Sequence, residues 1–200
     1  MRLSRSTQTG IIPTCVVCAV VVVAQAGCAG RSFSPYTSNG EMRRQPERAR
    51  ELHAKATRIA DEDPVEAERL LREALDADLY HGPSHNNLGI LLLARGDLYD
   101  AAHEFEWARK LMPGHPSPRV NLAMTLERAG KVDDALDEYD SALAVFDGFL
   151  PAIQGKARLQ VLSGRIDDET PALLESISLR GDQDWREWAK LEQIRLRRSR

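Results

Sequence analysis

Residues 82–115 read GPSHNNLGILLLARGDLYDAAHEFEWARKLMPGH and carry the pattern that the rest of the chain repeats. Apolar residues recur every three or four positions on both sides of Gly96, a spacing that gives each of two helices one apolar face. Gly96 can take the left-handed conformation that ends a helix, and Pro113 stops the second one. We therefore predict two short antiparallel helices, with Ser84 and Asp97 as their N-caps.

The same pattern returns 34 residues later. Its columns are Leu88, Gly89, Leu92, Gly96, Leu98, Ala101, Phe105 and Ala108, which become Leu122, Ala123, Leu126, Gly130, Val132, Ala135, Tyr139 and Ala142. Small residues fall where helices must approach closely, and an aromatic residue falls where a gap between helix pairs must be filled. This period and these columns resemble the tetratricopeptide repeat (TPR), a helix–turn–helix unit of 34 residues.

The resemblance covers residues 48–183 and implies an all-α, right-handed superhelical solenoid of about four repeats. We place the repeats at 48–81, 82–115, 116–149 and 150–183, the middle two matching best. In the first repeat Ala67, Leu71 and Ala74 fit their columns, whereas its first helix needs a one-residue shift to Leu52, Ala56 and Ile59. In the fourth, Ala157, Gly164, Ile166 and Leu173 fit, whereas Lys156, Gln160 and Glu169 do not.

Residues 184–200 are expected to form a capping helix with a basic tail. Trp185, Trp188, Leu191 and Ile194 recur at intervals of three and would cover the apolar end of the last repeat. The alternative is that the two tryptophans dock a partner. The tail from Arg195 to Arg200 either binds anionic headgroups or a polyanion, or simply complements the helix dipole.

Residues 1–28 have the features of an export leader. Arg2 and Arg5 precede a mostly apolar run over residues 11–24, which suits a signal-peptide core better than a membrane-spanning helix. Cleavage after Ala26 is one expectation. The sequence Ala26-Gly27-Cys28 also resembles a bacterial lipobox, in which Cys28 would carry the lipid, although Gln25 departs from that motif. A retained anchor is the third option, and all three place the rest of the chain outside the cytoplasm.

The remaining composition narrows the function. All three cysteines, Cys15, Cys18 and Cys28, lie in the leader, so no internal disulfide is expected in the rest. Residues 29–47 are rich in Ser, Pro, Gly and Arg and are expected to form a flexible linker. A net charge of −3 and a pI near 6.0 argue against a nucleic-acid binder.

Nothing in the sequence indicates an enzyme. His81 and His85 are separated by Gly82 and Pro83, which argues against a helical metal-ligand pair, and His53, His103 and His115 are isolated in sequence. There is no HExxH motif, glycine-rich phosphate loop or serine elbow. We expect no catalytic residues, no metal and no cofactor.

The resemblance implies that first helices line a concave face that binds an extended peptide or a partner helix. An asparagine before the Leu-Gly pair binds peptide backbone in several such proteins, and Asn87 and Asn121 hold that place here. An amide can both donate to and accept from a peptide bond. The alternative is that these amides contact solvent or the neighbouring repeat. The rest of the predicted face comprises Asn86, Ile90, Met124, Gln154 and Arg158.

The expected function is therefore that of a non-catalytic adaptor or scaffold of the cell envelope, resembling small bacterial TPR lipoproteins. Its partner would be another envelope protein, in a pilus, secretion, outer-membrane or cell-wall complex, and no small-molecule substrate or nucleic acid is expected. The alternatives are a permanent structural subunit of a membrane-associated complex and, less favoured, an enzyme or ligand-binding protein that uses the repeats as a scaffold.

Overall fold

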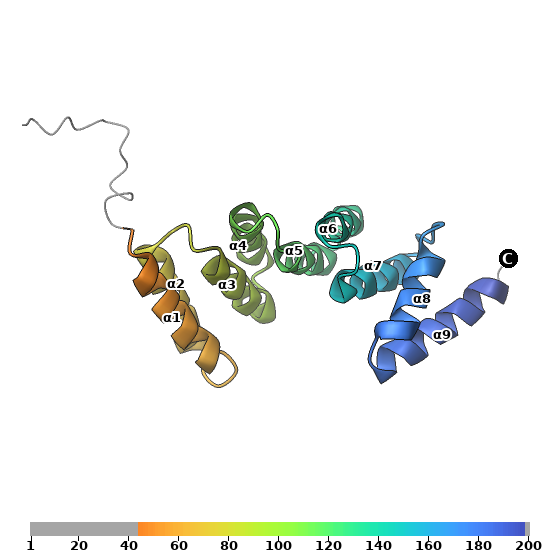
Figure 1. Ribbon diagram of the computed structural model, residues 1–200, viewed down its shortest axis with the longest axis horizontal. Coiled ribbons are helices and arrows are strands. Elements are labelled where there is room, and N and C mark those ends of the chain that lie inside the picture. The colour runs from red at the N-terminus through yellow and green to blue at the C-terminus, as the bar shows by residue number, and fades with distance from the viewer. Residues whose placement is uncertain (1–43, 199–200) are drawn as a thin grey trace, which may run out of the picture. The chain divides into compact units, whose positions relative to one another are not determined.

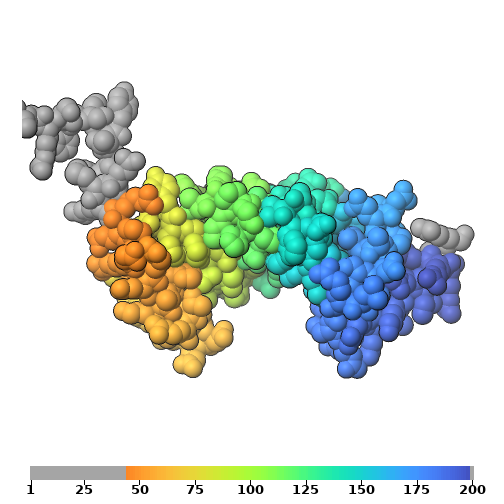
Figure 2. Space-filling view, viewed as in Figure 1, coloured from red at the N-terminus to blue at the C-terminus, as the bar shows by residue number. Residues whose placement is uncertain are grey.

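The computed structural model describes residues 44–198, and these residues form nine helices and no strand (Figure 1). The helices are α1 (Pro46–Ile59), α2 (Pro64–Ala77), α3 (Gly82–Arg95), α4 (Leu98–Leu111), α5 (Ser117–Arg128), α6 (Val132–Val145), α7 (Leu150–Ser163), α8 (Thr170–Arg180) and α9 (Gln183–Arg198). Four helix pairs and a final helix follow one another in chain order (Figure 2). The predicted all-α solenoid with a C-terminal helix is confirmed.

The packing follows a simple rule. Each first helix packs on its own second helix, as α3 does on α4 and α5 on α6, and each second helix packs on the next first helix. In addition, the consecutive first helices α1, α3, α5 and α7 contact one another. The first helices of the four pairs therefore form a continuous row.

The middle repeats owe their geometry to glycines and to one aromatic ring each. Gly96 and Gly130 have φ of 94° and 75°, in the left-handed region that favours glycine. Gly96 ends α3, and Gly130 lies in the turn that follows α5. Phe105 is fully buried, and a methyl group at Gly89 would lie 2.6 Å from its ring, so only glycine allows this approach. The predicted columns of these two repeats are confirmed.

The side-chain N-caps expected at Ser84 and Asp97 are not confirmed. Ser84 lies inside α3, fully buried, and its Oγ lies 2.7 Å from His81 Nδ1, because the helix already begins at Gly82. Asp97 does precede α4, but its carboxylate accepts a hydrogen bond from Arg95 Nε at 2.5 Å instead of capping the helix.

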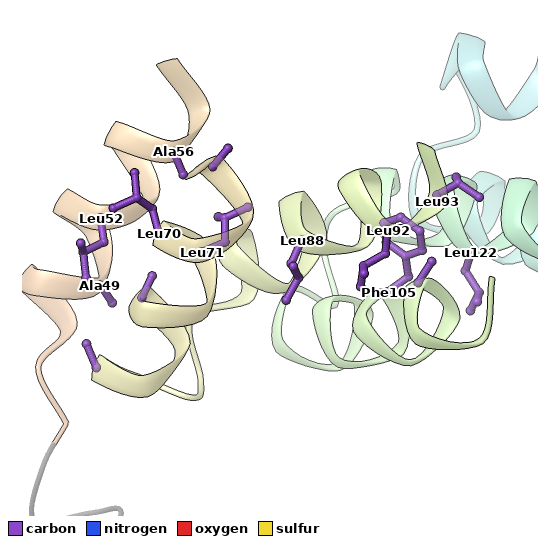
Figure 3. Close-up of a cluster of buried hydrophobic side chains, with 14 residues drawn as sticks. Ala49, Leu52, Ala56, Leu70, Leu71, Leu88, Leu92, Leu93, Phe105 and Leu122 are labelled. Atoms are coloured by element: carbon purple, nitrogen blue, oxygen red, sulfur yellow. The ribbon is translucent and has the colours of Figure 1, made fainter. Parts of the chain in front are cut away.

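The N-terminal half of the described chain is held by one apolar cluster that runs from α1 to α5 (Figure 3). Its members are Ala49, Leu52, Ala56, Ala67, Leu70, Leu71, Ala74, Ala77, Leu88, Leu92, Leu93, Ala101, Phe105 and Leu122. Two further clusters follow, one around Tyr139 and one between α7, α8 and α9. The core is thus a chain of contacts between neighbouring helices, as expected of a repeat protein.

The first repeat departs from the 34-residue period in its first helix. α1 begins at Pro46, inside the segment predicted as linker, and ends at Ile59. The turn that follows is longer than the one at Gly96, and Asp63 caps α2 by accepting from the Glu66 amide at 3.0 Å. The predicted apolar face is confirmed, since Leu52 and Ala56 are buried and Ile59 is partly buried against the cluster.

The fourth pair departs in its second helix. Gly164 has φ of 70° and ends α7 as predicted, but α8 begins only at Thr170. Its buried residues Thr170, Leu174 and Ile177 lie one position beyond the 34-residue columns, and Ile166 is exposed. The expectation that Ile166 and Leu173 fill core columns of this repeat is therefore wrong for Ile166, while Leu173 is only partly buried.

The helix α9 covers the last pair, but with a different face from the one predicted. Ala189 and Glu192 are buried, and Trp185, Trp188 and Leu196 are partly buried against α7 and α8. Leu191 and Ile194 are 65% and 48% exposed. The predicted stripe is correct for the two tryptophans and wrong for the two aliphatic residues.

The leader over residues 1–28, Cys28 and most of the predicted linker lie outside the described residues. Within residues 44–198 no helix is long and apolar enough to cross a membrane.

Candidate functional site

The seven residues predicted to bind a peptide lie on three consecutive first helices. Helix α3 carries Asn86, Asn87 and Ile90, α5 carries Asn121 and Met124, and α7 carries Gln154 and Arg158. None of these side chains is fully buried, and α3, α5 and α7 contact one another in the row. We call this set of residues the first-helix surface.

Hydrogen bonds between amides link neighbouring repeats across this surface. Asn87 Nδ2 lies 3.0 Å from His53 Nε2 and donates to Thr57 Oγ1 at 3.1 Å, which ties α3 to α1. Asn86 donates to Asn87 Oδ1 at 3.3 Å and accepts from Asn121 Nδ2 at 2.9 Å, which ties α3 to α5. The structure therefore shows the repeat-to-repeat contact that was the alternative interpretation, and peptide binding by these amides stays a prediction.

The amides differ in which of their hydrogen-bond donors and acceptors remain available to a ligand. Both Nδ2 hydrogens of Asn87 are used in the contacts with His53 and Thr57. Asn121 Oδ1, in contrast, accepts no hydrogen bond from any described residue, and Asn86 Nδ2 makes only one. Asn121 can therefore accept a backbone N–H from a bound segment without breaking the links between repeats.

Two exposed apolar side chains lie beside the amides. Ile90 and Met124 are 44% and 39% exposed and occupy equivalent positions in successive repeats. Apolar area that a partner would cover is worth about 25 cal/mol per Å².

At its C-terminal end the surface meets two aromatic rings. Arg158 Nη2 donates to Glu127 Oε2 at 2.7 Å and also lines a hollow of about 240 Å³ with Asp184, Trp185 and Trp188. The tryptophan rings meet edge to face, with centroids 5.4 Å apart. A hollow lined by two indole rings can hold an aromatic or aliphatic side chain.

The sequence reasoning missed His53, Thr57 and the two tryptophans as parts of this region. His53 could have been found, because it lies 34 residues before Asn87, which lies 34 before Asn121. No comparable signal in the sequence joins Arg158 to α9, since their contact depends on how α9 crosses the last pair.

His53 is not isolated in the structure, contrary to expectation. The rings of His53 and His81 meet edge to face 5.2 Å apart, and burial lowers the pKa of both. His85 is buried, with Nδ1 2.6 Å from Glu104 Oε2 and Nε2 2.8 Å from the Leu79 carbonyl, and it stacks on Trp107. The His85 contact with the Leu79 carbonyl joins the first two repeats, whereas its contacts with Glu104 and Trp107 lie within the second. Residues 44–198 contain no group of three or more ligands suited to a metal ion.

Solved structures with this fold are numerous, and three illustrate its range. The first TPR of Spaghetti (RPAP3), bound to the HSP90 peptide SRMEEVD, is 16% identical with a TM-score of 0.58, covering 61% of this chain and 98% of that one. MamA is 18% identical, with a TM-score of 0.59 and coverage of 66% and 77%. The Thermobaculum terrenum O-GlcNAc transferase, a mutant, is 23% identical with a TM-score of 0.59, covering 70% of this chain but 26% of the enzyme. At these identities the likeness concerns the fold.

No curated protein matches the chain. A family does match, over residues 43–180, which contain all four helix pairs. The chain belongs to the family described as the Protein kinase G tetratricopeptide repeat.

Proposed function

We propose that the protein is a non-catalytic adaptor that binds an extended segment of another protein along the first-helix surface. The observation that carries this proposal is the pair Ile90 and Met124, exposed at equivalent positions of adjacent repeats and flanked by amides. Neighbouring exposed apolar side chains, in contrast to single scattered ones, mark interaction surfaces.

The chemistry of the surface favours a particular kind of segment. The seven residues include one cation, Arg158, which is already paired with Glu127. A strongly acidic peptide would therefore find little electrostatic attraction there. We expect a segment with aliphatic or aromatic side chains, one per repeat, whose backbone N–H is accepted by Asn121 Oδ1. An aromatic side chain would fit the hollow between Arg158 and the tryptophans.

Support for peptide binding comes from the fold and from the surface together. The RPAP3 repeat domain was solved with a bound peptide, so a row of helix pairs of this kind can hold one. In this chain the first helices are the row that presents hydrogen-bonding and apolar groups side by side.

We further propose that the adaptor works in the cell envelope, exported by its leader and anchored through a lipid on Cys28, with a partner in a pilus, secretion, outer-membrane or cell-wall complex. The support is the order of basic, apolar and small residues in residues 1–28. Replacing Cys28→Ser is expected to abolish incorporation of labelled lipid and release the protein from membranes. Continued labelling of that variant would rule out Cys28 as the lipid site.

The binding proposal is tested by affinity capture of the full chain, comparing the wild type with an Ile90→Arg/Met124→Arg variant. Val65→Arg is the matched control, because Val65 is 79% exposed but lies on a second helix. A partner retained by the control and lost by the double variant supports the proposal. A partner that both variants retain equally would place the binding site elsewhere.

A further inference from the structure

A second surface, formed by second helices, shares no residue with the first-helix surface. A groove of about 520 Å³ lies between the second helices α4 and α6, with α5 as its floor. It is lined by Tyr99, Ala102, His103, Glu106, Arg109, Leu122, Leu126, Lys131, Asp134, Asp137 and Glu138. Leu122 and Leu126 project from the side of α5 opposite to Asn121 and Met124, so the groove and the first-helix surface can be occupied independently.

The charge of the groove comes chiefly from α6. The helix carries the five carboxylates Asp133, Asp134, Asp137, Glu138 and Asp140 and no lysine or arginine. Asp133, Glu138 and Asp140 form ion pairs with Arg165, Arg109 and Lys156. Asp134 and Asp137 form no ion pair with any described residue, and both line the groove.

A third carboxylate in the groove is only half satisfied. Glu138 Oε1 accepts from Arg109 at 2.5 Å across the groove, but Glu138 Oε2 is buried without a hydrogen-bond partner. Burial raises the pKa of Glu138. The lining holds the four carboxylates Glu106, Asp134, Asp137 and Glu138 against the two cations Arg109 and Lys131, so negative charge predominates in the groove.

The matching surface is on the same chain, at its C-terminal end. The face of α9 that points away from α8 carries Lys190, Leu191, Ile194, Arg195 and Arg198, all of them exposed. We call this face the α9 stripe. Its two aliphatic residues are those that the capping contact leaves uncovered. Its three cations outnumber its one exposed carboxylate, Glu187, which lies on the same face one turn earlier, since Glu192 is buried and paired with Arg195.

We propose that the α4–α6 groove of one copy binds the α9 stripe of a second copy. Leu191 and Ile194 would cover the half-buried Ala102 and Leu126, while Lys190 and Arg198 would pair with Asp134 and Asp137. The inner face of α9 is already packed on α8, so the stripe is available without unfolding the cap. Because groove and stripe are different surfaces, the contact is head to tail and can repeat from copy to copy.

This self-association does not depend on the adaptor function, but it would change how the adaptor binds its partner. A head-to-tail array joined through α6 and α9 leaves Ile90, Asn121 and Met124 of every copy open. Several weak binding sites would then act together on a partner that offers repeated segments.

The test is co-purification of two differently tagged full-length copies produced in one cell. Groove variant Asp134→Lys/Asp137→Lys and stripe variant Lys190→Glu/Arg198→Glu each put like charges into the contact. Each variant is expected to lose co-purification with itself by about tenfold or more relative to the wild type, because like charges that face each other cost several kcal/mol. The control is Glu51→Lys/Glu62→Lys, which reverses two exposed carboxylates far from both surfaces.

Mixing the two variants separates a specific contact from misfolding. In a groove variant paired with a stripe variant, the reversed groove faces a reversed stripe and the native groove faces a native stripe. Co-purification should therefore return when both are produced together, although each fails alone. Wild-type copies that do not co-purify, single variants that still do, or a mixture that stays separate would each overturn the proposal.

Discussion

The third and fourth helix pairs perform the same structural task with different chemistry. In the third, α5 and α6 meet through Ala123, Ala135 and Tyr139, all buried. In the fourth, the places equivalent to Leu122 and Leu126 are taken by Lys156 and Gln160, both of them buried. Both pairs nevertheless consist of two helices that pack on each other.

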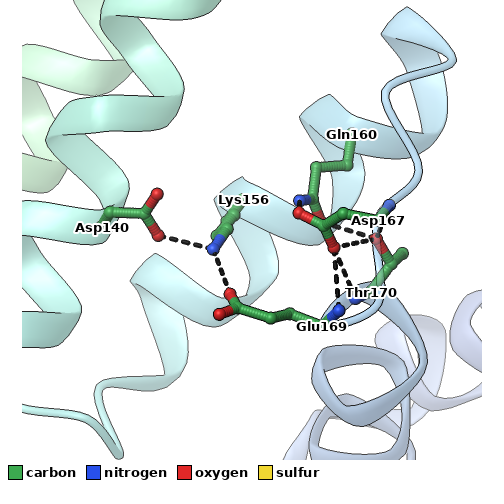
Figure 4. A network of polar contacts seen from close by, with 6 residues as sticks. All are labelled: Asp140, Lys156, Gln160, Asp167, Glu169 and Thr170. Atoms are coloured by element: carbon green, nitrogen blue, oxygen red, sulfur yellow. Dashed lines mark hydrogen bonds and ion pairs between the residues drawn. The ribbon is translucent and has the colours of Figure 1, made fainter.

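The polar residues of the fourth pair are satisfied by the loop that follows α7 (Figure 4). Lys156 Nζ lies 2.5 Å from Asp140 Oδ1 and 2.7 Å from Glu169 Oε2. Gln160 donates to Asp167 at 2.6 Å and accepts from the Thr170 hydroxyl at 3.0 Å. The longer loop that displaces α8 by one residue thus also supplies Glu169 to the buried ammonium of Lys156 and Asp167 to the buried amide of Gln160. Buried polar groups are tolerated when every one is paired.

If the apolar columns hold the middle pairs, truncating one should have the largest effect. Leu88 is buried in the column equivalent to Lys156. Leu88→Ala is expected to lower the free energy of unfolding by about 2–5 kcal/mol, since it removes buried methyl groups and leaves a cavity. Urea denaturation followed by circular dichroism measures this loss, and a loss below about 1 kcal/mol would contradict the assigned column.

Filling a close contact should cost somewhat less. Ala101 and Ala135 are fully buried where helices cross. Ala101→Leu or Ala135→Leu is expected to destabilise the protein by about 1–3 kcal/mol through overpacking. Ala94→Leu, at an exposed position of α3, is the matched control and should change stability by no more than about 0.5 kcal/mol. Equal thermal midpoints for Ala101→Leu and Ala94→Leu would show that the repeat register is wrong.

The fourth pair should respond differently to loss of its buried residue. Lys156→Met keeps the volume and removes a charge whose partners, Asp140 and Glu169, are themselves exposed and can be hydrated. Replacing a buried ion pair by an apolar side chain of similar size is often neutral or stabilising. We expect a change within about 1 kcal/mol in either direction. A loss as large as that of Leu88→Ala would mean that the polar network, and not the shape of the pair, holds α7 on α8.

The smallest expected effect is a pH dependence confined to the fourth pair. Burial opposes ionisation of Asp167, but hydrogen bonds from the Thr170 hydroxyl and backbone lower its pKa. Burial likewise opposes the charge on Lys156, but Asp140 and Glu169 raise its pKa. The Asp167 contribution is complete above an unfolded pKa of about 3.9 and is lost as pH falls through the lower folded value. The Lys156 contribution is complete below about 10.4 and is lost as pH rises through the higher folded value.

Hydrogen exchange measures this difference directly. After correction for intrinsic rates, amides of α7 and α8 should lose protection at the acid and alkaline limits before those of α3 and α4. Asp167→Asn keeps an acceptor for Thr170 but does not titrate, so the acid effect should disappear in that variant. Loss of protection in all four helices at one pH would contradict a local origin.

The fold could be predicted from the sequence at the positions where a contact or turn requires one particular type of residue. Gly89 and Phe105, repeated as Ala123 and Tyr139, identify the close approach and the ring that fills it, and Gly96, Gly130 and Gly164 mark the turns. Periodic columns could be counted because these contacts are local and apolar.

The departures arise where loop length changes. The turn after α1 and the loop before α8 each insert residues, so the buried residues of α1 and α8 leave the 34-residue frame. Whether the extra residues lengthen the loop before a helix or the one after it depends on tertiary contacts, such as the Asp167–Thr170 hydrogen bonds. The repeat period carries no information about such contacts. The face of α9 was misassigned for a similar reason, because an interval of three drifts around a helix of 3.6 residues per turn.

The candidate site was predictable as a surface but not as a network. The seven residues do lie on consecutive first helices, which follows from the repeat frame. That Asn121 contacts Asn86 and not Asn87, or that Arg158 approaches Trp185 and Trp188, depends on side-chain reach between helices.

The most direct test of the account is to ask which face a partner touches. A photo-crosslinking residue placed in the full chain at position 90 or 124 samples the first-helix surface, and one at position 65 samples a more exposed position on a second helix. We predict that one protein crosslinks at positions 90 and 124 and not at 65. Crosslinks to that protein from position 65 alone would contradict the proposal that the first-helix surface is the binding site.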